Sequence, residues 1–370
     1  MTAKTINIIG GGIAGISLAI TLEQLGVKYQ LYEQNQKISY DDVGLGISAN
    51  IFPILKAWNV FHETELLGGY IKEFHFVNKN MKYLKSFNLK KPALSVRRKP
   101  FYEVLESKLN FSNTFLGQQK SFDDLNPSEI VVSADGINSK ARKALHPSIP
   151  VRDSKQLLWR GISNIQLPKK YRNAYHDFVG KNLRFAIIHT GGNHYSWYLI
   201  KELDKSFDGL KTKRDLIDNF LIDYPAVIHE VIDNSDEIFF SKLLDINPQR
   251  RKNKYWHKGN HILIGDSIHP TTPNMANGAC LSIEDGFILG KLLSQYESQI
   301  AFDLFQKDRE KKVNSVVNQS WLFGKSMHWN SQVLTYLTEK IIQLTPQLLF
   351  EAIYSNVLKE SKLLPTNDRP

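Results

Sequence analysis

Residues 5–33, TINIIGGGIAGISLAITLEQLGVKYQLYE, decide the fold class of this chain. The run from Ile6 to Ile9 is short and mostly apolar, as is typical of a parallel strand covered on both faces. Apolar residues recur at helical spacing over 13–25, and Gly26 then supplies a natural helix stop. A second apolar run, 29–33, has the length of a strand. A strand, a helix and a strand in this order predict a βαβ unit and an α/β class.

The turn between the first strand and the helix carries Gly10, Gly12 and Gly15 at GxGxxG spacing. Glycines at these positions allow a tight turn, close approach of the backbone to a pyrophosphate, and close packing of the helix on the strand. The helix N-terminus adds unpaired N–H groups and a dipole that favours phosphate. Glu33 ends the second strand, where a carboxylate can hold a ribose hydroxyl. The segment therefore predicts a site for an adenine dinucleotide without a 2′-phosphate, either FAD or NAD.

Two later segments run from an apolar strand into an aspartate at a glycine-containing turn. They are VVSADGINSKAR, residues 131–142, and ILIGDSIHP, residues 262–270. In open α/β sheets the carboxyl ends of the strands are where ligands bind, so Asp135 and Asp266 are candidate site residues. Each aspartate could equally cap a helix, and the residues alone leave both interpretations open.

The middle of the chain has a different pattern. Residues 157–200 alternate as strands do, and Gly191 and Gly192 indicate a hairpin between two of these strands. Helices are expected after 49–50 (with Leu55, Trp58 and Val60 inside), over 100–109, 213–232, 278–293, and along the tail 301–360 with a break at Pro346. The predicted fold is α/β, with a Rossmann-like dinucleotide domain, a second, mainly antiparallel β-sheet domain, and a C-terminal helical segment.

The two domains are expected to interleave along the chain. The dinucleotide-binding domain is assigned to 1–70, 96–156 and 246–325, the substrate domain to 71–95 and 157–245, and the C-terminal helices to 326–370.

Composition excludes several classes of function. The net charge of +10 favours anionic ligands, but the lysines are spread along the chain beside no DNA-binding motif, so we expect no nucleic-acid partner. The single cysteine, Cys280, excludes an internal disulfide and indicates a reducing compartment. The histidines lack metal-ligand spacing, and no apolar run is long enough to span a membrane. We expect a cytoplasmic protein without a metal, as a monomer or a weak homodimer.

Taken together, these segments resemble the FAD-dependent aromatic hydroxylases, the class A flavoprotein monooxygenases related to para-hydroxybenzoate hydroxylase. That family carries GxGxxG with a distal glutamate, an arginine before a helix, ADGxxSxxR, and GDxxHPxxPxxGxG. Here the same order is Gly10–Glu33, Arg98, Ala134–Arg142 and Gly265–Gly278. The stretch PNMANGACLSIEDG looks nearest to the branch that contains zeaxanthin epoxidase and the tetracycline hydroxylases. Ordered motifs of this kind are far more specific than any one of them.

The resemblance implies an oxidoreductase that keeps FAD bound and uses NADPH or NADH as co-substrate. Dioxygen would form a flavin hydroperoxide that hydroxylates or epoxidises a planar, largely apolar, aromatic small molecule. The resemblance places Asp266 at the ribityl chain, Arg98 at the ribityl or phosphate part, and the N–H groups of Asn277 and Gly278 at the pyrimidine edge. The implied cofactor-binding set is Gly10, Gly12, Ala14, Gly15, Glu33, Gly44, Gly46, Arg98, Asp135, Asp266, Pro273, Asn277 and Gly278. The sequence identifies no catalytic side chain.

The chain departs from the family pattern near the expected flavin ring. The usual Gly-Gln-Gly is Ala276-Asn277-Gly278, and Arg97 could take the role of Arg98. Two alternatives therefore remain, another flavin oxidoreductase such as a reductase and a non-catalytic flavin-binding protein. The apolar tail, 333–358, could cap the substrate cavity, bridge the domains or touch a membrane, and docking onto the body is the preferred interpretation.

Several further side chains have two interpretations each. His269 is expected to be structural rather than a base, and Arg160 to contact either an anionic substrate or a carboxylate. Phe185, Trp197 and Tyr198 are expected either to line the substrate side or to belong to the core.

Overall fold

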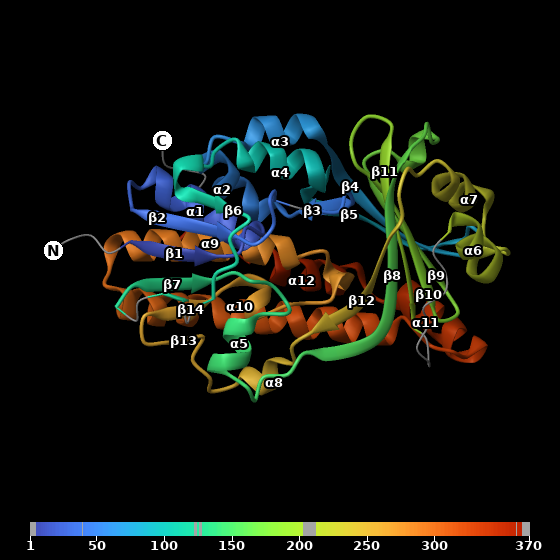
Figure 1. The fold of residues 1–370 in the computed structure, drawn as a ribbon. Helices are drawn as coiled ribbons and strands as arrows, with labels where there is room; N and C mark the ends of the chain where they lie inside the picture. Colours follow the sequence, from blue (N-terminus) through green and yellow to red (C-terminus); the bar gives the residue numbers. More distant parts are fainter. Residues whose placement is uncertain are drawn as a thin grey trace.

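The computed structural model describes residues 5–38, 40–121, 124–125, 128–202, 212–359 and 361–364. Two sheets dominate the described part of the chain, and long helices join them (Figure 1). The six-stranded sheet has the order β13-β14-β7-β1-β2-β6, and the eight-stranded sheet has the order β12-β8-β11-β10-β9-β4-β5-β3. The predicted α/β class with a second, mainly antiparallel sheet and C-terminal helices is confirmed.

The predicted βαβ unit forms the centre of the six-stranded sheet. Strand β1 (Ile6–Ile9) lies between β2 (Tyr29–Glu33) and β7 (Ile130–Ser133), and all three are parallel. Helix α1 (Ile13–Gln24) links β1 to β2, and Gly26 has φ +65 at its end. The other strands are β6 (Thr114–Leu116), β14 (His261–Leu263) and the antiparallel β13 (His257–Lys258). The carboxyl ends of the parallel strands therefore meet at one edge of this sheet.

The eight-stranded sheet contains the predicted hairpin, with Gly191 (φ +89) and Gly192 (φ +56) in its turn. Its strands are β3 (Gly44–Ile47), β4 (Gly68–Asn78), β5 (Tyr83–Arg97), β8 (Arg152–Asn164), β9 (Ala174–Gly180), β10 (Leu183–His189), β11 (His194–Glu202) and β12 (Phe239–Asp245). Strands β3, β4, β5, β9 and β12 were not predicted individually from the sequence.

One face of this sheet packs on the helical segment of residues 213–233. The expected continuous helix is instead broken before Pro225 into α6 (Lys213–Leu216), η5 (Ile217–Leu221) and α7 (Ala226–Asp233). Phe185 and Trp197 stack on each other within the apolar core on this face, with ring centroids 5.6 Å apart. They are therefore core residues, whereas Tyr198, the next residue of its strand, points to the opposite face.

The helix expected after residues 49–50 is shorter than predicted. It comprises η1 (Ala49–Ile51) and α2 (Phe52–Ala57), and Trp58 only caps it. Asn59 adopts a left-handed conformation with φ +56, which turns the chain, so Val60 lies outside the helix and α3 (Phe61–Leu67) begins next. Helix α4 (Arg98–Glu106) also begins two residues before Pro100.

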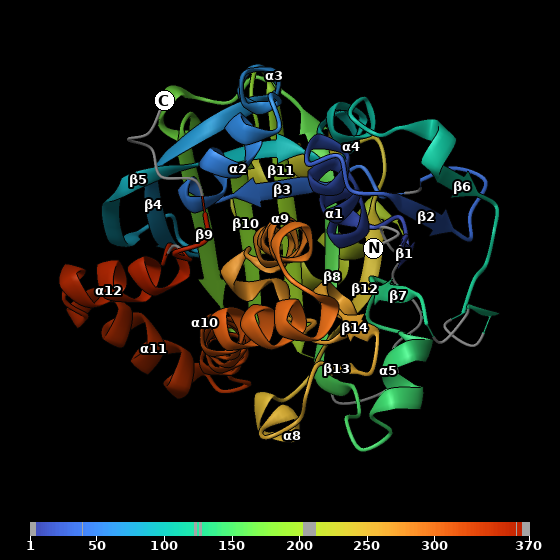
Figure 2. The same ribbon diagram turned by 90° about the vertical axis from the view of Figure 1, so that its left-hand side faces the viewer.

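Two long helices, α9 (Gly278–Gln295) and α10 (Ser298–Ser326), connect the two halves of the molecule (Figures 1 and 2). The tail forms α11 (Gln332–Leu344) and α12 (Gln347–Val357), with the predicted break at Pro346. It packs against the eight-stranded sheet through Phe350, which contacts Phe76 and Phe87. The described chain also forms the short α-helices α5 (Lys140–Leu145) and α8 (Pro248–Arg251). Of the described helices, none combines the length and apolar character that a membrane span requires.

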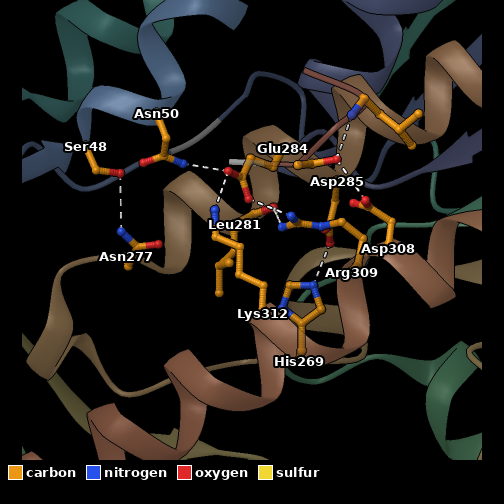
Figure 3. Close-up of polar contacts among 12 residues, drawn as sticks. Ser48, Asn50, His269, Asn277, Leu281, Glu284, Asp285, Asp308, Arg309 and Lys312 are labelled. Atoms are coloured by element: carbon orange, nitrogen blue, oxygen red, sulfur yellow. Dashed lines mark hydrogen bonds and ion pairs between the residues drawn. The ribbon is translucent and has the colours of Figure 1, made fainter. Parts of the chain in front are cut away.

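A buried ionic network joins α9 to α10 (Figure 3). Arg309 donates to Asp285 Oδ1 at 2.8 Å and to Glu284 Oε2 at 2.6 Å, and all three side chains are fully buried. Lys312 lies 2.5 Å from the second oxygen of Glu284, which also accepts a hydrogen bond from Asn50. Each carboxylate is therefore matched by a cation, which is the condition for burying a charge.

The same network fixes the turn that contains Asp266. Asp285 Oδ2 accepts from the backbone N–H of Gly265 at 2.8 Å and lies 2.5 Å from His269 Nε2. Burial alone would raise the pKa of Asp285, but His269 and Arg309 outweigh it and hold this pKa at about 2. His269 therefore has a structural partner, as expected from the sequence.

Replacing Arg309 tests the network. Arg309→Met is expected to lower the free energy of unfolding by about 3–5 kcal/mol, because two buried carboxylates lose their main cation. Denaturant unfolding measures the change, and Lys311→Met, an exposed change on the same helix, is the control and should stay within about 0.5 kcal/mol of wild type. An Arg309→Met protein as stable as the control would contradict the proposed role of this ion pair.

The loop before α9 contains a strained residue. Ala276 has φ +48 and an exposed side chain, and this left-handed conformation costs an alanine roughly 1–2 kcal/mol. The family pattern that the sequence resembles has glycine at this position, and glycine would adopt the same conformation without strain.

Ala276→Gly is expected to raise the free energy of unfolding by up to about 1 kcal/mol, net of the greater freedom of glycine in the unfolded chain. Ala352→Gly in α12, where the backbone is helical, should instead lower it by about 0.5–1 kcal/mol. Thermal and denaturant unfolding of both variants measure the two changes. A loss of stability in Ala276→Gly equal to that of the control would show that position 276 is not strained.

Candidate functional site

A groove of about 360 Å³ opens at the carboxyl ends of β1, β2 and β7. Backbone and polar side chains from four loops line it, including Gly10, Gly11, Gly12, Glu33, Asn35, Gln118, Lys120, Ser121, Asp135, Gly136, Asn138 and Lys140. This is the edge of a parallel sheet at which the sequence predicts a dinucleotide.

The glycine turn makes the floor of the groove. Gly10 has φ +107, and a Cβ there would lie 2.4 Å from the carbonyl oxygen of Ala134. A Cβ on Gly15 would lie 2.0 Å from the carbonyl oxygen of Gly10, so Gly15 is required for packing of α1. At Gly12 a Cβ would meet no described atom within 4 Å, which leaves the start of α1 open to the groove. Ala14, by contrast, is buried and packs towards Gly265 rather than towards the groove.

Glu33 lies at the side of the groove, and its carboxylate is held by backbone N–H groups and by the side chain of Asn35. Its Oε2 accepts from Gly11 N–H at 2.8 Å, and its Oε1 accepts from the N–H and the side-chain amide of Asn35 at 2.9 and 2.7 Å. A carboxylate offers about four acceptor positions, so this orientation still leaves lone pairs for ribose hydroxyls.

Asp135 both caps a helix and faces the groove. Its Oδ2 accepts from the N–H groups of Lys140 and Ala141 at the start of α5, at 2.9 and 3.4 Å. Its Oδ1 is buried and, among the described residues, has no hydrogen-bond partner. The capping interpretation therefore applies to this residue, and its second oxygen is a position where a ligand donor would be favourable.

Arg142 connects the two aspartate turns. Its guanidinium donates to the carbonyl oxygen of Ile137 at 2.5 Å and to that of Ser267 at 2.6 Å. The turn that follows β7 is thereby tied to the turn that follows β14, and Asp266 is brought to the same side of the sheet as Asp135.

Asp266 is an exposed residue, and its carboxylate lies within the electrostatic field of Arg98. Desolvation by the surrounding loops raises the pKa of Asp266, while His269 and Arg98 oppose this rise. Arg98 is partly exposed and donates to Tyr102 at 3.3 Å, whereas Arg97 forms an ion pair with Asp42. Arg98 is thus the better placed of the two arginines to contact a ligand beside Asp266.

The loop of residues 273–278 continues from this turn into α9. Pro273 is exposed, and Asn277 is buried with its amide donating to Ser48 Oγ at 3.3 Å (Figure 3). A Cβ on Gly46 would lie 3.5 Å from the carbonyl oxygen of Ala276, which places β3 beside this loop. Gly44 must be glycine for a different reason: a Cβ there would lie 2.2 Å from the Ser196 side chain.

A buried charged cluster lies on the inner face of the eight-stranded sheet. Arg184 on β10 forms an ion pair with Asp177 on β9, and both side chains are almost inaccessible to solvent. Arg184 also donates to the hydroxyl of Tyr198 at 3.0 Å and to Asn274 Oδ1 at 3.1 Å. The bond to Asn274 connects the sheet directly to the loop of residues 273–278.

Two tyrosines extend this cluster into an aromatic wall. The hydroxyls of Tyr175 and Tyr198 are hydrogen-bonded to each other, and Tyr175 stacks on Phe74 with ring centroids 4.4 Å apart. Burial raises the pKa of both phenols, so both stay neutral at physiological pH and keep a proton to donate.

Sequence reasoning missed Arg184, Asp177 and Tyr175. The signal available was a single charged residue within each of two apolar strand segments, AYHDFVG and LRFAIIH. Pairing of the two strands brings these charges to diagonal positions on one face. Arg160, for which a carboxylate contact was one interpretation, lies 3.2 Å from Asp41. Within the described ranges no group of three or more His, Cys, Asp or Glu side chains could hold a metal.

Comparison with known proteins places this architecture among flavoproteins. Residues 115–320 match the FAD binding domain family. The chain is 24% identical to the aurachin C monooxygenase/isomerase of Stigmatella aurantiaca, over 93% of this chain and 94% of that protein. It is also 24% identical to the 2-heptyl-3-hydroxy-4(1H)-quinolone synthase of Pseudomonas aeruginosa, over 92% and 94%.

Solved structures agree with the fold. Klebsiella pneumoniae HpxO, complexed with FAD and uric acid, superimposes with a TM-score of 0.84 at 18% identity and covers 96% of this chain and 97% of its own. Because the family match spans more than half of the chain and includes the turns of Asp135 and Asp266, this protein belongs to the FAD binding domain family.

Proposed function

We propose that this protein is an NAD(P)H-dependent FAD monooxygenase that hydroxylates or epoxidises a planar, largely apolar aromatic molecule. One observation carries the proposal. The loop of residues 273–278 adjoins the Asp266 turn at one end, and through Asn274 it contacts the buried Arg184 of the second sheet. A cofactor that extended from the groove to this loop would end beside the aromatic wall.

The adenosine and pyrophosphate half of FAD fits the groove. Glu33 would hold the ribose hydroxyls, and the open space at Gly12 would admit the pyrophosphate to the N-terminus of α1. Asp135, with its unpaired Oδ1, would accept a hydrogen bond from the ligand. Gly10, Ala14 and Gly15 would act indirectly, by allowing the turn and the close packing around it.

The flavin half fits the second group of residues. Asp266 would accept from ribityl hydroxyls, and Arg98 would lie against the ribityl or phosphate part. The N–H groups of Asn277 and Gly278 begin α9, and the positive end of its dipole would stabilise negative charge on the pyrimidine edge. Pro273, Gly44 and Gly46 would border the ring system.

FAD, when bound, supplies the redox chemistry, taking electrons from NAD(P)H and activating dioxygen. The protein's own residues position the substrate and exclude water. Phe74 and Tyr175 offer flat apolar surface, and the neutral hydroxyl pair of Tyr175 and Tyr198 offers a hydrogen bond to a polar ring substituent. Arg184 orients that pair through its bond to Tyr198.

The names of the relatives support the substrate class. They denote an aurachin C monooxygenase/isomerase and a synthase of 2-heptyl-3-hydroxy-4(1H)-quinolone, and the latter product is a planar heteroaromatic ring with an alkyl chain. We extend this class to the present protein and place it in the cytoplasm, as a monomer or weak homodimer.

We also propose which segments of the chain bind the cofactor and which bind the substrate. Cofactor binding belongs to 1–70, 96–156 and 246–325, substrate binding to 71–95 and 157–245, and the C-terminal helices to 326–370.

A direct test uses the visible spectrum of the purified protein. After incubation with FAD and desalting, it is expected to keep a flavin spectrum that bleaches anaerobically with NADPH or NADH. Supplied with a 2-alkyl-4-quinolone and isotopically labelled dioxygen, it should place one labelled oxygen atom in the product, as mass spectrometry detects. Protein that stays colourless would overturn FAD binding, and product without label would overturn oxygen transfer.

Asp266→Ala is expected to weaken FAD binding by about 10- to 100-fold, because a hydrogen bond to a charged group contributes about 1.5–3 kcal/mol. Titration of apoprotein with FAD, followed by flavin fluorescence, measures this change. Asp236→Ala, an exposed change in the loop before β12, should bind FAD as the wild type does. Wild-type affinity in the Asp266 variant would remove this residue from the site.

A further inference from the structure

Helix α11 has its polar and apolar faces reversed relative to an ordinary surface helix. The side that packs on the protein includes Thr335, Thr338 and Glu339, with Ile342 as its buried apolar residue. The opposite side is apolar and exposed, with Val333 69%, Ile341 65% and Leu344 80% accessible. A helix at a protein–water boundary normally shows the opposite arrangement.

The next helix also begins with exposed apolar side chains. Leu348 and Leu349 at the start of α12 are 75% and 52% accessible. We call Val333, Leu337, Ile341, Leu344, Leu348 and Leu349 the outer apolar face. Figure 2 shows α11 and α12 together at one side of the molecule, away from the six-stranded sheet. Contiguous apolar surface of this kind marks a place where a protein contacts a partner or a lipid surface.

Aromatic residues flank the outer apolar face. Tyr336 is 58% accessible and Trp329, just before α11, is 43% accessible. Tyrosine and tryptophan are the side chains enriched where hydrocarbon meets lipid headgroups.

Exposed lysines lie at one end and along one side of α11. The backbone N–H of Asn182 donates to the carbonyl oxygen of Trp329 at 3.0 Å, which brings the exposed Lys181 to one end of α11. Asn78 donates to Glu339 at 3.3 Å, which brings the exposed Lys79 and Lys82 beside α11, at the edge of its packed side. Lys340 is exposed on α11 itself. The acidic Glu351 nearby is ion-paired with Lys90 at 2.7 Å, and Glu339, the carboxylate beside Lys79 and Lys82, accepts from Asn78.

We propose that the outer apolar face docks on the surface of a bilayer that contains anionic lipids. The apolar side chains would enter the boundary between headgroups and acyl chains, and the nearby lysines would meet the negative headgroups. The helices lie on the surface rather than cross it, in line with their length and composition. A second copy of the chain is the weaker occupant, because a two-fold contact through this face would bring two sets of lysines together.

This location connects to the aromatic wall, and this part of the inference rests on the proposed function. Phe350 of α12 stacks on Phe87, and Phe87 stacks on Phe74, with ring centroids 5.3 and 5.2 Å apart. Phe74 in turn stacks on Tyr175. Aromatic side chains therefore run without interruption from the lipid-facing helices to the proposed substrate site. An aromatic substrate with an alkyl chain partitions into lipid, and docking would place its reservoir beside the enzyme.

Sedimentation with lipid vesicles tests the docking directly. The FAD-loaded protein is expected to sediment with vesicles of phosphatidylcholine and phosphatidylglycerol and much less with vesicles of phosphatidylcholine alone. The triple variant Leu337→Gln, Ile341→Gln, Leu344→Gln should bind the mixed vesicles on the order of 100-fold more weakly, since each of these side chains would lose its burial in lipid. Lys79→Gln, Lys82→Gln, Lys181→Gln should lose only the preference for phosphatidylglycerol.

The matched control changes apolar residues of similar exposure elsewhere. Leu66, Phe111 and Ile222 are 74%, 59% and 67% accessible, and their triple glutamine variant should bind as the wild type does. FAD retention and thermal unfolding confirm that every variant is folded. Wild-type protein that stays in the supernatant, or a Leu337, Ile341, Leu344 variant that binds like the control, would overturn the proposal. A dimer that this variant dissociates, without vesicle binding by the wild type, would assign the face to a second copy.

These measurements need no substrate and no NAD(P)H. Failure of vesicle binding would therefore leave the monooxygenase proposal intact, and failure of turnover would leave the docking result intact.

Discussion

Two adjacent buried carboxylates, Glu284 and Asp285, set the strictest constraint on this fold. An unpaired charge cannot remain in a dry interior, so α10 must bring Arg309 and Lys312 to within hydrogen-bonding distance of α9. The second oxygen of Asp285 then accepts from Gly265 and contacts His269, which fixes the turn that carries Asp266 (Figure 3). The geometry of the expected flavin site therefore depends on charges that never touch the flavin.

In the groove, too, the residues that hold the structure differ from the residues that face a ligand. The guanidinium of Arg142 donates to two carbonyl oxygens of the protein. Gly10 and Gly15 must be glycine because a Cβ at either position would collide with a backbone carbonyl oxygen. The groups left open are the N–H groups at the start of α1, the Asp266 carboxylate and one oxygen of Asp135. Buried charges and glycines build the frame, and the polar groups that face the groove remain available to a ligand.

How much the sequence could predict depends on how local the determining interactions are. The βαβ unit and the hairpin at Gly191–Gly192 follow from periodicity and turn residues, and the structure contains both. The turns of Asp135 and Asp266 were also found, because each motif lies within a few residues. The Arg184–Asp177 pair needs the register of β9 against β10, which no local pattern specifies. The early end of α2 depends on one left-handed residue, Asn59, and asparagine carries that signal only weakly.

Polar residues on the inside of a helix have different consequences in α10 and α11. In α10 the inward charges of Arg309 and Lys312 are compensated by carboxylates of α9. In α11 the hydroxyls of Thr335 and Thr338 donate to carbonyl oxygens one turn earlier, both at 2.9 Å. Burying these hydroxyls therefore costs little free energy, because each has a hydrogen-bond partner. The leucine and isoleucine side chains on the outer side of α11, by contrast, remain exposed to solvent. Because the inner side of α11 is satisfied within the protein, its exposed apolar side is the part that a lipid surface would cover, with the nearby lysines available to anionic headgroups.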